Sequence, residues 1–346
     1  MTREPVFTET DVEVISHWQD QLRPQTMSQV VGQEQVVRRL EIAIRAAQKR
    51  KEPLAHVLFD GPPGLGKTTL ATVLAEEMGS PITILSGPAL SAPKDLLSSL
   101  TNAEEASILF IDEIHRLPTN VEEFLYPVME DFRVDFVLGD GINARTINYQ
   151  LKPFTIVGAT TRSGMLSAPL RDRFLTREHL DFYSVGNLTE IINRNAFTLK
   201  TEISVSSSKE LAKRSRGTPR IANNRLRWVR DYVTSESDGR ITLESTREAL
   251  KMQGIDPQGL EPRDRKYLDT LIRIFSGGPT GVEAIAHTMN TATDTLRDEI
   301  EPYLLRCGYV IRTPRGRIAT DTAWQHMGKH PPAEEPTIDT DQGELF

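Results

Sequence analysis

A glycine-rich loop carries the strongest chemical signature of the sequence. Residues 61–68 read GPPGLGKT and match the pattern G-x-x-x-x-G-K-[ST] at every fixed position. The loop follows a short β-rich run, HVLFD, and opens a helical run, TTLATVLAEEM, which is the context that the pattern requires. Glycines such as Gly64 and Gly66 let backbone N–H groups turn toward phosphates, and the helix N-terminus adds positive potential. Lys67 is expected to reach the β- and γ-phosphates of a nucleotide.

Two threonines after the lysine complete the expected nucleotide contacts. Thr68 is predicted to ligate Mg²⁺, and Thr69 can donate to the α-phosphate. The sequence therefore predicts a site for ATP with Mg²⁺. The alternative is a chance glycine-rich turn, which the flanking strand and helix disfavour.

A pair of acids follows an apolar run 45 residues after the lysine, in ILFIDE at 108–113. Four apolar residues would carry the acids to the end of a buried strand, where ligands bind in parallel α/β sheets. Asp112 is predicted to hold magnesium through water, and Glu113 to orient and deprotonate the attacking water. Two solvated acids at a strand end are the alternative, and the phosphate loop makes it the weaker one.

Further polar residues lie where a nucleotide-hydrolysing site would need them. The β-rich run at 154–159 ends in Thr160, Thr161 and Arg162, so a polar side chain would sit between the acids and the γ-phosphate. Arginines follow in RDRF at 171–174 and GTPRI at 217–221. A lone arginine is usually a surface charge, but phosphoryl transfer builds negative charge that arginines stabilise.

The elements that would position these residues change in kind along the chain. Up to about Tyr183, short β-branched runs alternate with helical periodicity, which predicts an α/β domain with a parallel sheet buried on both faces. Four helical runs follow, at 187–199, 207–215, 219–233 and 243–254. Three more helical runs precede two β runs around a Pro-Arg-Gly turn in YVIRTPRGRIAT, the order of a winged helix.

Length and composition bound these interpretations. The 346 residues suggest two or three domains, and no apolar run is long enough for a membrane span. A single cysteine, Cys307, excludes an internal disulfide and fits a reducing cytoplasm. The net charge is −7, yet residues 302–329 carry five basic residues against one acid. That segment is either a nucleic-acid footprint or a solvated face, and charge alone does not decide between them.

Several longer blocks closely resemble the RuvB family of AAA+ motors, which migrate Holliday junctions in bacteria. The resemblance runs from about residue 22 to 328 and rests on LRPQTMSQVVGQ, HVLFDGPPGLGKTTLA, SGPAL, LFIDEIHRL, YPVMEDFRVD, GATTRSGMLSAPLRDRF, RSRGTPRIAN and RTPRGRIAT. It implies a RecA-like AAA+ ATPase core at 22–183, a small helical lid at 184–255 and a winged-helix DNA-binding domain at 256–330. An N-terminal arm at 1–21 and an acidic, disordered tail at 331–346 complete the expected organisation.

The resemblance also implies roles for particular residues near the nucleotide. Leu22 and Arg23 match residues beside the adenine, and Tyr183 lies near the join of core and lid. Thr161 matches the sensor on the third strand, and Arg220 matches the second sensor, carried on the lid.

The resemblance implies further roles, at a neighbouring subunit, at the nucleotide region and at a partner protein. Arg173 matches the arginine finger, which would reach the ATP of the next subunit in a hexameric ring. Glu130, Asp131 and Phe132 resemble a segment that also touches the nucleotide region. The stretch from 132 to 149 has the alternation of a hairpin, and the matching hairpin of the family contacts RuvA. Without the resemblance, a plain surface hairpin would fit this stretch equally well.

The winged domain is expected to bind double-stranded DNA. Arg312 and Arg317 match wing arginines that hold duplex phosphates, and Arg315 between them is a weaker candidate. The implied partners are Holliday-junction DNA, RuvA and a RuvC-like resolvase. The protein is expected to act in the cytoplasm, at the nucleoid, and not at a membrane. The chain departs from the family at 175–177, close to the finger, at Trp228, and at Thr293 in the winged domain, where some members have an arginine.

Two other functions stay open at this stage. A clamp loader or replication initiator of the same class is one, although RTPRGR favours phosphate gripping over base reading. A scaffold that binds ATP without hydrolysing it is the other, and the intact Glu113 disfavours it.

Overall fold

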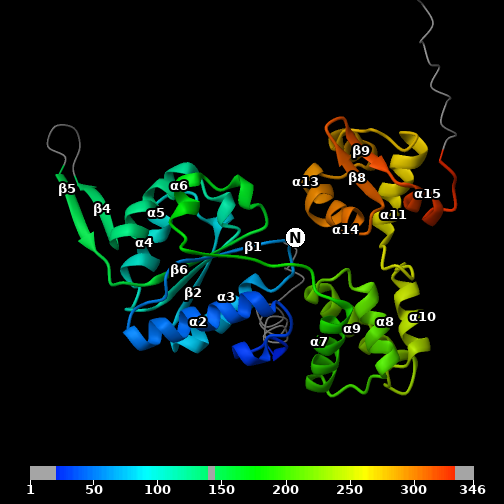
Figure 1. The fold of residues 1–346 in the computed structure, drawn as a ribbon, viewed down its shortest axis with the longest axis horizontal. Coiled ribbons are helices and arrows are strands. Elements are labelled where there is room, and N and C mark those ends of the chain that lie inside the picture. Colours follow the sequence, from blue (N-terminus) through cyan, green and yellow to red (C-terminus); the bar gives the residue numbers. More distant parts are fainter. Residues whose placement is uncertain (1–20, 139–144, 332–346) are drawn as a thin grey trace, which may run out of the picture. The chain divides into compact units, whose positions relative to one another are not determined.

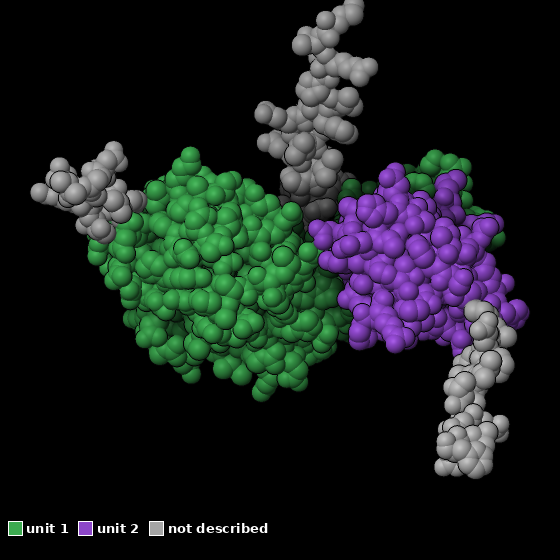
Figure 2. All heavy atoms as spheres, turned by 90° about the horizontal axis from the view of Figure 1, so that it is seen from above, with its two compact units in different colours: residues 1–250 green, residues 251–346 purple. Residues whose placement is uncertain are grey.

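The computed structural model describes residues 21–138 and 145–331 of the chain. The chain forms two compact units that divide between residues 250 and 251 (Figure 2). The residues expected to form the ATPase core and most of those expected to form the lid lie in the first unit. The last five residues of the expected lid, 251–255, lie in the second unit with the residues expected to form the winged helix. The exact limits of the three domains remain predictions. The expected arm and acidic tail lie outside the described residues, apart from residues 21 and 331.

A five-stranded parallel sheet forms the centre of the first unit, with the order β2-β3-β6-β1-β7. Its strands are β1 (Val57–Asp60), β2 (Ile82–Ser86), β3 (Ile108–Asp112), β6 (Thr155–Thr160) and β7 (Thr176–His179). The parallel α/β sheet predicted from the apolar runs is therefore confirmed. Strand β7 was not predicted from the sequence, because its residues TREH have no apolar pattern and the strand lies at the edge of the sheet.

Helices cover both faces of this sheet (Figure 1). They are α2 (Glu34–Arg50), α3 (Lys67–Met78), α4 (Lys94–Thr101), α5 (Thr119–Asp131) and α6 (Ala168–Asp172). Helix α3 is capped at its C-terminus by Gly79, whose φ of 62° is a left-handed conformation that glycine adopts readily. A core of buried side chains, including Leu96, Ile111, Leu125 and Phe154, joins α4, α5 and α6 to one sheet face.

An antiparallel hairpin projects from this part of the chain, formed by β4 (Arg133–Leu138) and β5 (Arg145–Gln150). Arg133 pairs with Gln150 in its register. The predicted hairpin is thus present, and residues 139–144 between its strands lie outside the described residues.

Four helices after the sheet match the four predicted helical runs. They are α7 (Val185–Thr198), α8 (Val205–Arg214), α9 (Pro219–Glu236) and α10 (Leu243–Met252). Ser184 and Ser204 cap α7 and α8, each accepting a backbone N–H through its side chain. Trp228, one of the departures from the family, donates its indole N–H to Ala249 O at 2.8 Å and so joins α9 to α10.

The second unit contains helices followed by a two-stranded hairpin, the order predicted for a winged helix. Its elements are α11 (Pro262–Asp269), the π-helical η6 (Thr270–Ile274), α12 (Val282–Met289), α13 (Thr293–Thr295), the π-helical η7 (Leu296–Ile300), α14 (Glu301–Arg306), β8 (Val310–Thr313), β9 (Gly316–Ala319) and α15 (Asp321–His326). Thr280 extends the hairpin, because its N–H and C=O bond to the backbone of Arg317 at 3.0 and 2.7 Å.

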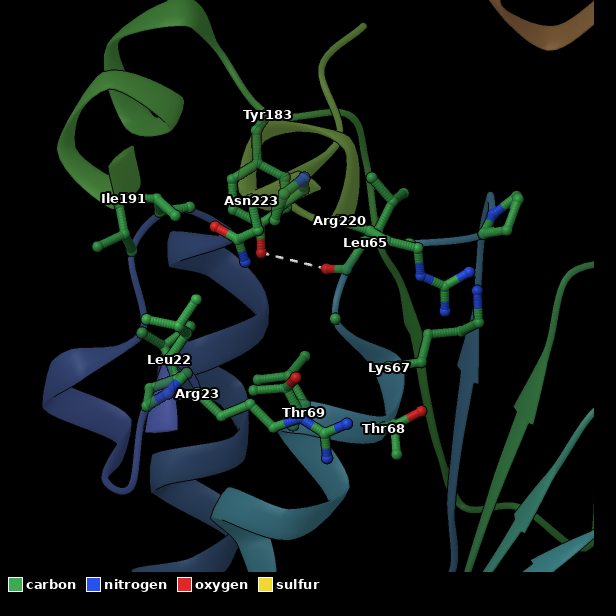
Figure 3. Close-up of a pocket in the computed structure, with 18 of the residues that line it drawn as sticks. Leu22, Arg23, Leu65, Lys67, Thr68, Thr69, Tyr183, Ile191, Arg220 and Asn223 are labelled. Carbon is green, nitrogen blue, oxygen red and sulfur yellow. Dashed lines mark hydrogen bonds between the residues drawn. The ribbon is translucent and has the colours of Figure 1, made fainter. Parts of the chain in front are cut away.

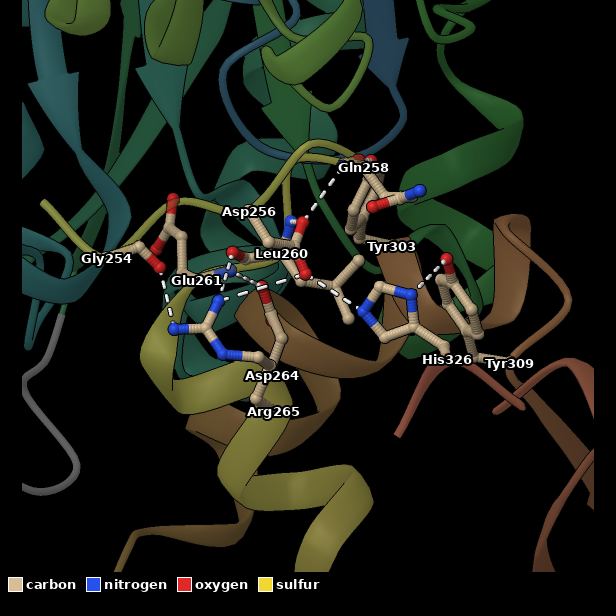
Figure 4. A network of polar contacts seen from close by, with 10 residues as sticks. All are labelled: Gly254, Asp256, Gln258, Leu260, Glu261, Asp264, Arg265, Tyr303, Tyr309 and His326. Carbon is tan, nitrogen blue, oxygen red and sulfur yellow. Dashed lines mark hydrogen bonds and ion pairs between the residues drawn. The ribbon is translucent and has the colours of Figure 1, made fainter. Parts of the chain in front are cut away.

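A polar network ties the first turn of this unit to its last helix (Figure 4). Asp256 accepts the N–H of Leu260 at 2.8 Å and contacts Nε2 of His326 at 2.9 Å. Tyr303 donates its hydroxyl to Gln258 O at 2.6 Å. The unit is thus closed on itself by contacts that span its whole sequence. Among the residues described in either unit, no helix has the length and apolar character needed to cross a bilayer.

Candidate active site and nucleic-acid interface

The glycine-rich loop curls at the N-terminus of α3 and faces a pocket (Figure 3). Gly64 and Gly66 have φ of 79° and 101°, values that side chains rarely tolerate. Gly66 is the N-cap of α3 and uses no side chain, so the first N–H groups of the helix are available to an anion. The lid approaches the loop closely, since a Cβ on Gly64 would lie 2.7 Å from Cγ2 of Thr218.

Lys67 lies folded over this loop and is almost fully buried. Its Nζ donates to Gly61 O at 2.7 Å and to Pro62 O at 2.8 Å. Burial lowers the pKa of Lys67 to about 8, although the negative charges of Asp112 and Glu113 partly oppose this shift. An incoming phosphate would offer the ammonium group a full charge in place of two carbonyl dipoles.

The two predicted acids lie at the end of β3, next to the loop. Glu113 takes a left-handed conformation with φ of 52°, and its N–H donates to Oδ1 of Asp112 at 2.9 Å. Its Oε2 accepts from the hydroxyl of Thr161 at 3.4 Å and lies 3.4 Å from Nε2 of His115. The other ring nitrogen of His115 lies 2.9 Å from the hydroxyl of Thr160. The catalytic candidate Glu113 is therefore oriented from two sides.

His115 is a functional candidate that the sequence motifs did not indicate. It lies two residues beyond Glu113 in the turn after β3, and its side chain is buried. A pattern match cannot find it, because its partner Thr160 is 45 residues away and only the pairing of β3 with β6 brings the two together.

Most of the predicted nucleotide residues meet in the one pocket. These are Leu22, Arg23, Gly64, Gly66, Lys67, Thr68, Thr69, Asp112, Glu113, Thr161, Tyr183 and Arg220. The hydroxyl of Thr68 and the carboxylate of Asp112 are oxygen donors of the kind that Mg²⁺ prefers, so the residues present fit that ion. The backbone N–H of Arg220 reaches Gly64 O at 3.4 Å, so the lid and the loop are in contact.

The pocket also has a lining that the motifs did not reveal, made of Val30, Val31, Ile191, Arg194, Pro219, Asn223, Asn224 and Arg227. Tyr183 lies among these groups and donates its hydroxyl to Leu65 O at 3.2 Å (Figure 3). Burial raises the pKa of Tyr183 to about 12, which keeps this hydroxyl a donor. Apolar and amide side chains around one end of the pocket suit a nucleobase.

The predicted arginine finger, Arg173, lies outside this pocket. In the part of the chain that the structure describes, the lining of the pocket includes neither Arg173 nor residues 130–132. Nη2 of Arg173 lies 3.0 Å from Oε1 of Glu130, and its Nη1 donates to Pro169 O at 2.6 Å. The guanidinium also stacks 4.2 Å from the centre of the Tyr126 ring. Asp131 and Phe132 follow Glu130 at the end of α5, so the predicted arginine finger lies beside the segment that was expected to touch the nucleotide region.

The candidate DNA-binding arginines lie on the hairpin of the second unit. Arg312 on β8 is directly opposite Arg317 on β9, and Arg315 is exposed in the turn that joins the strands. Both strand arginines form ion pairs with the buried Glu301, at 2.6 Å for Arg312 and 2.9 Å for Arg317. The arginines were predicted from the sequence, but their shared carboxylate was not.

Comparisons with known proteins give a consistent result over nearly the whole described chain. Three family models match in succession: the Holliday junction DNA helicase RuvB P-loop domain at residues 22–180, the RuvB AAA lid domain at 183–256 and the RuvB C-terminal winged helix domain at 257–328. The Holliday junction branch migration complex subunit RuvB of Rhodopirellula baltica is 57% identical over 311 residues, covering 90% of this chain and 85% of the relative. The subunit of the same name from Desulfosudis oleivorans is 53% identical and covers 89% and 90%.

Solved structures agree with these relatives. The Thermotoga maritima RuvB Holliday junction branch migration motor superposes with a TM-score of 0.83 at 46% identity, covering 90% of this chain and 100% of that one.

Proposed function

Because the chain belongs to the RuvB family of P-loop ATPases, we propose that it is an ATP-driven motor that pumps duplex DNA and so migrates Holliday junctions in homologous recombination and DNA repair. The observation that carries the proposal is the pocket that unites the phosphate loop, the two strand-end acids and the lid arginine Arg220. A nucleotide bound there touches core and lid at once, which couples hydrolysis to movement of the lid.

The chain's own residues divide the work of hydrolysis. Lys67 leaves its two loop carbonyls and pairs with the β- and γ-phosphates, while the N–H of Thr69 and its hydroxyl lie toward the α-phosphate. Thr68 and Asp112 hold Mg²⁺, which when bound supplies positive charge for the developing transition state. Glu113, oriented by Thr161 and His115, accepts the proton of the attacking water.

Sensing of the γ-phosphate falls to residues on different elements. Thr161 follows the end of β6 and Arg220 is the second residue of α9. Both line the pocket, so both respond to the loss of one phosphate charge. Leu22, Arg23 and Tyr183 hold the base end of the nucleotide. Since Tyr183 lies just before α7 and Arg220 lies on α9, a change at either is passed to these lid helices.

A neighbouring subunit completes the site. Arg173 is held by Glu130 and Tyr126 outside the pocket of its own chain, so it serves the ATP of the next subunit in a homohexamer. Glu130, Asp131 and Phe132 belong to the same surface and contribute to that shared nucleotide region. Arginine at this place stabilises charge that develops during phosphoryl transfer.

DNA and protein partners follow from the same assignment. Arg312, Arg317 and, more weakly, Arg315 hold phosphates of double-stranded DNA, so binding is largely independent of sequence and sensitive to salt. The β4–β5 hairpin receives RuvA, and a RuvC-like resolvase acts on the same junction. The motor works in the cytoplasm, at the nucleoid where recombining DNA is found.

A four-way junction assay with the acid variant tests the proposal. The wild-type chain with RuvA should convert a labelled synthetic junction to duplex products in an ATP-dependent way. Glu113→Gln should bind ATP yet lose turnover and branch migration by on the order of a hundredfold or more, the scale of a lost catalytic base. A motor of the clamp-loader or initiator kind would hydrolyse ATP without moving the junction. Turnover of the variant within a few-fold of wild type would remove Glu113 from its assigned role.

A further inference from the structure

A single buried carboxylate organises the whole positive cluster of the wing. Glu301 is the first residue of α14, and none of its side chain is exposed. Its Oε2 accepts hydrogen bonds from Nε and Nη2 of Arg312, at 3.1 and 2.6 Å, and a third from Nη2 of Arg317, at 3.1 Å. Its Oε1 accepts Nε of Arg317 at 2.9 Å and the hydroxyl of Tyr267 at 3.0 Å. The carboxylate is therefore saturated with donors.

Glu301 offsets the charge repulsion that the hairpin register would otherwise create. Arg312 and Arg317 are direct cross-strand partners, and like charges in such positions repel each other. Glu301 lies between them and carries the charge that lets both guanidinium groups stay close. Burial alone would raise the pKa of Glu301, but the hydrogen bonds and charges of Arg317 and Arg312 outweigh burial, and the net pKa is lowered. The group thus remains an anion.

The two arginines are held with different edges available. Both bonds from Arg312 use its Nε–Nη2 edge, so neither uses Nη1, and 48% of its side chain is exposed. Arg317 gives the same edge to both carboxylate oxygens, and 17% of its side chain is exposed. A planar guanidinium that is fixed along one edge presents the other edge in a set direction, which favours binding of phosphate oxygens.

We propose that Glu301 is a positioning residue for DNA binding, which holds Arg312 and Arg317 so that their outer N–H groups meet backbone phosphates. This inference rests on the proposed function of the wing as a DNA grip. The negative charge of Glu301 then strengthens DNA binding through the two arginines, although by itself it would repel the DNA phosphates.

Charge and positioning predict opposite outcomes when Glu301 is neutralised. If only net charge matters, Glu301→Gln makes the wing more positive by one, so duplex affinity rises and its salt dependence steepens by about 0.9 in the slope of log affinity against log salt. If Glu301 positions the arginines, the same variant loses affinity by about tenfold, the scale of one charge-assisted hydrogen bond, and its salt slope becomes shallower. Glu301→Asp keeps the charge but shortens the side chain, so positioning predicts a loss here too.

The matched control is Glu299→Gln, two residues earlier. Its side chain is 63% exposed and lies 3.8 Å from Arg263 rather than beside the wing arginines. Neutralising this acid also raises the net charge by one, so the duplex affinity of the variant should stay equal or rise slightly. All variants are made in the full chain, and duplex binding is measured by fluorescence anisotropy over a series of salt concentrations, with thermal unfolding followed in parallel.

Each result decides the matter. Weaker binding and a shallower salt slope for Glu301→Gln and Glu301→Asp, at temperatures where both remain folded, support the proposal. Equal or tighter binding overturns it, and so does weak binding that appears only where the winged domain has melted. The double variant Arg312→Ala with Arg317→Ala separates the two levels of inference. If it binds duplex as wild type does, the wing is not the DNA grip, and the proposed function fails at that point rather than at Glu301.

Discussion

Arg173 offers the sharpest test of catalysis shared between subunits. The residue is absent from the described lining of its own nucleotide pocket, so a chain that lacks it should keep its phosphate loop and acids intact. Arg173→Ala should therefore bind ATP but lose hydrolysis by on the order of a thousandfold or more, the range for a lost arginine finger. Lys67→Ala should also be inactive, because it removes the contact of the lysine with the phosphates. This variant still carries Arg173 and can supply it to a neighbouring subunit.

The structural cost of removing Arg173 is modest. Its contact with the Tyr126 ring contributes about 0.5–2 kcal/mol. Its partner Glu130 is 57% exposed, so the ion pair adds about 0–1 kcal/mol and leaves no buried charge behind. The variant is expected to fold, and loss of activity then reports on chemistry. Arg171→Ala, two residues away on α6, is the matched control and should keep most of the activity.

Mixing the two inactive variants gives a quantitative expectation. A productive interface forms only where the intact pocket of an Arg173→Ala subunit faces the intact finger of a Lys67→Ala subunit. If subunits mix at random, the fraction of such interfaces is the product of the two mole fractions, with a maximum of about one quarter at equal amounts. Phosphate release should follow this parabola as the ratio is varied. Mixtures that contain the Lys67→Ala, Arg173→Ala double variant in place of one partner should show no recovery. If no ratio restores activity while rings still form, Arg173 does not act across the interface.

Two further predictions concern the sheet and the lid. His56 accepts the N–H of Ile156 through Nδ1 at 2.9 Å, and burial lowers its pKa despite the contact with Met129 O. The unfolded chain therefore takes up a proton below about pH 6.5 that the folded chain excludes, so the free energy of unfolding should fall as pH falls, by up to about 1.4 kcal/mol per unit. Urea unfolding of wild type and His56→Gln at about pH 7.5 and pH 5.5 measures this, and equal pH dependence of the two proteins would contradict it. Gly64→Ala places a Cβ 2.7 Å from Thr218 Cγ2 and should weaken nucleotide binding by about tenfold or more, whereas Gly79→Ala, with a similar positive φ of 62° and open space around it, should not. Titration with a fluorescent nucleotide distinguishes them, and similar losses in both variants would point to backbone strain rather than to the lid contact.

The local sequence determined the chemistry of the nucleotide site to a large extent. A glycine-rich turn between a strand and a helix has few uses other than phosphate binding. Parallel strands end at the same edge of a sheet, so Lys67, Asp112 and Glu113 had to lie close together. Helical periodicity likewise predicted the four lid helices, since each must bury one face. The resemblance of longer blocks added Leu22, Arg23, Tyr183 and Arg220, which no spacing argument would have joined to the loop.

Tertiary structure alone decided which groups hold these residues in place. Strand β7 escaped prediction because an edge strand can be polar, and its place is set by pairing with β1 rather than by its own pattern. His115, Glu130 and Glu301 are single acids or bases in ordinary helical or turn sequence, where a solvated charge and a structural one look alike. Glu301 is recognised only when α14 packs beneath the hairpin and brings two arginines, 11 and 16 residues further along the chain, onto its two oxygens. Chain-local patterns encode what a residue can do, whereas burial and the partners of a charge depend on contacts between distant segments.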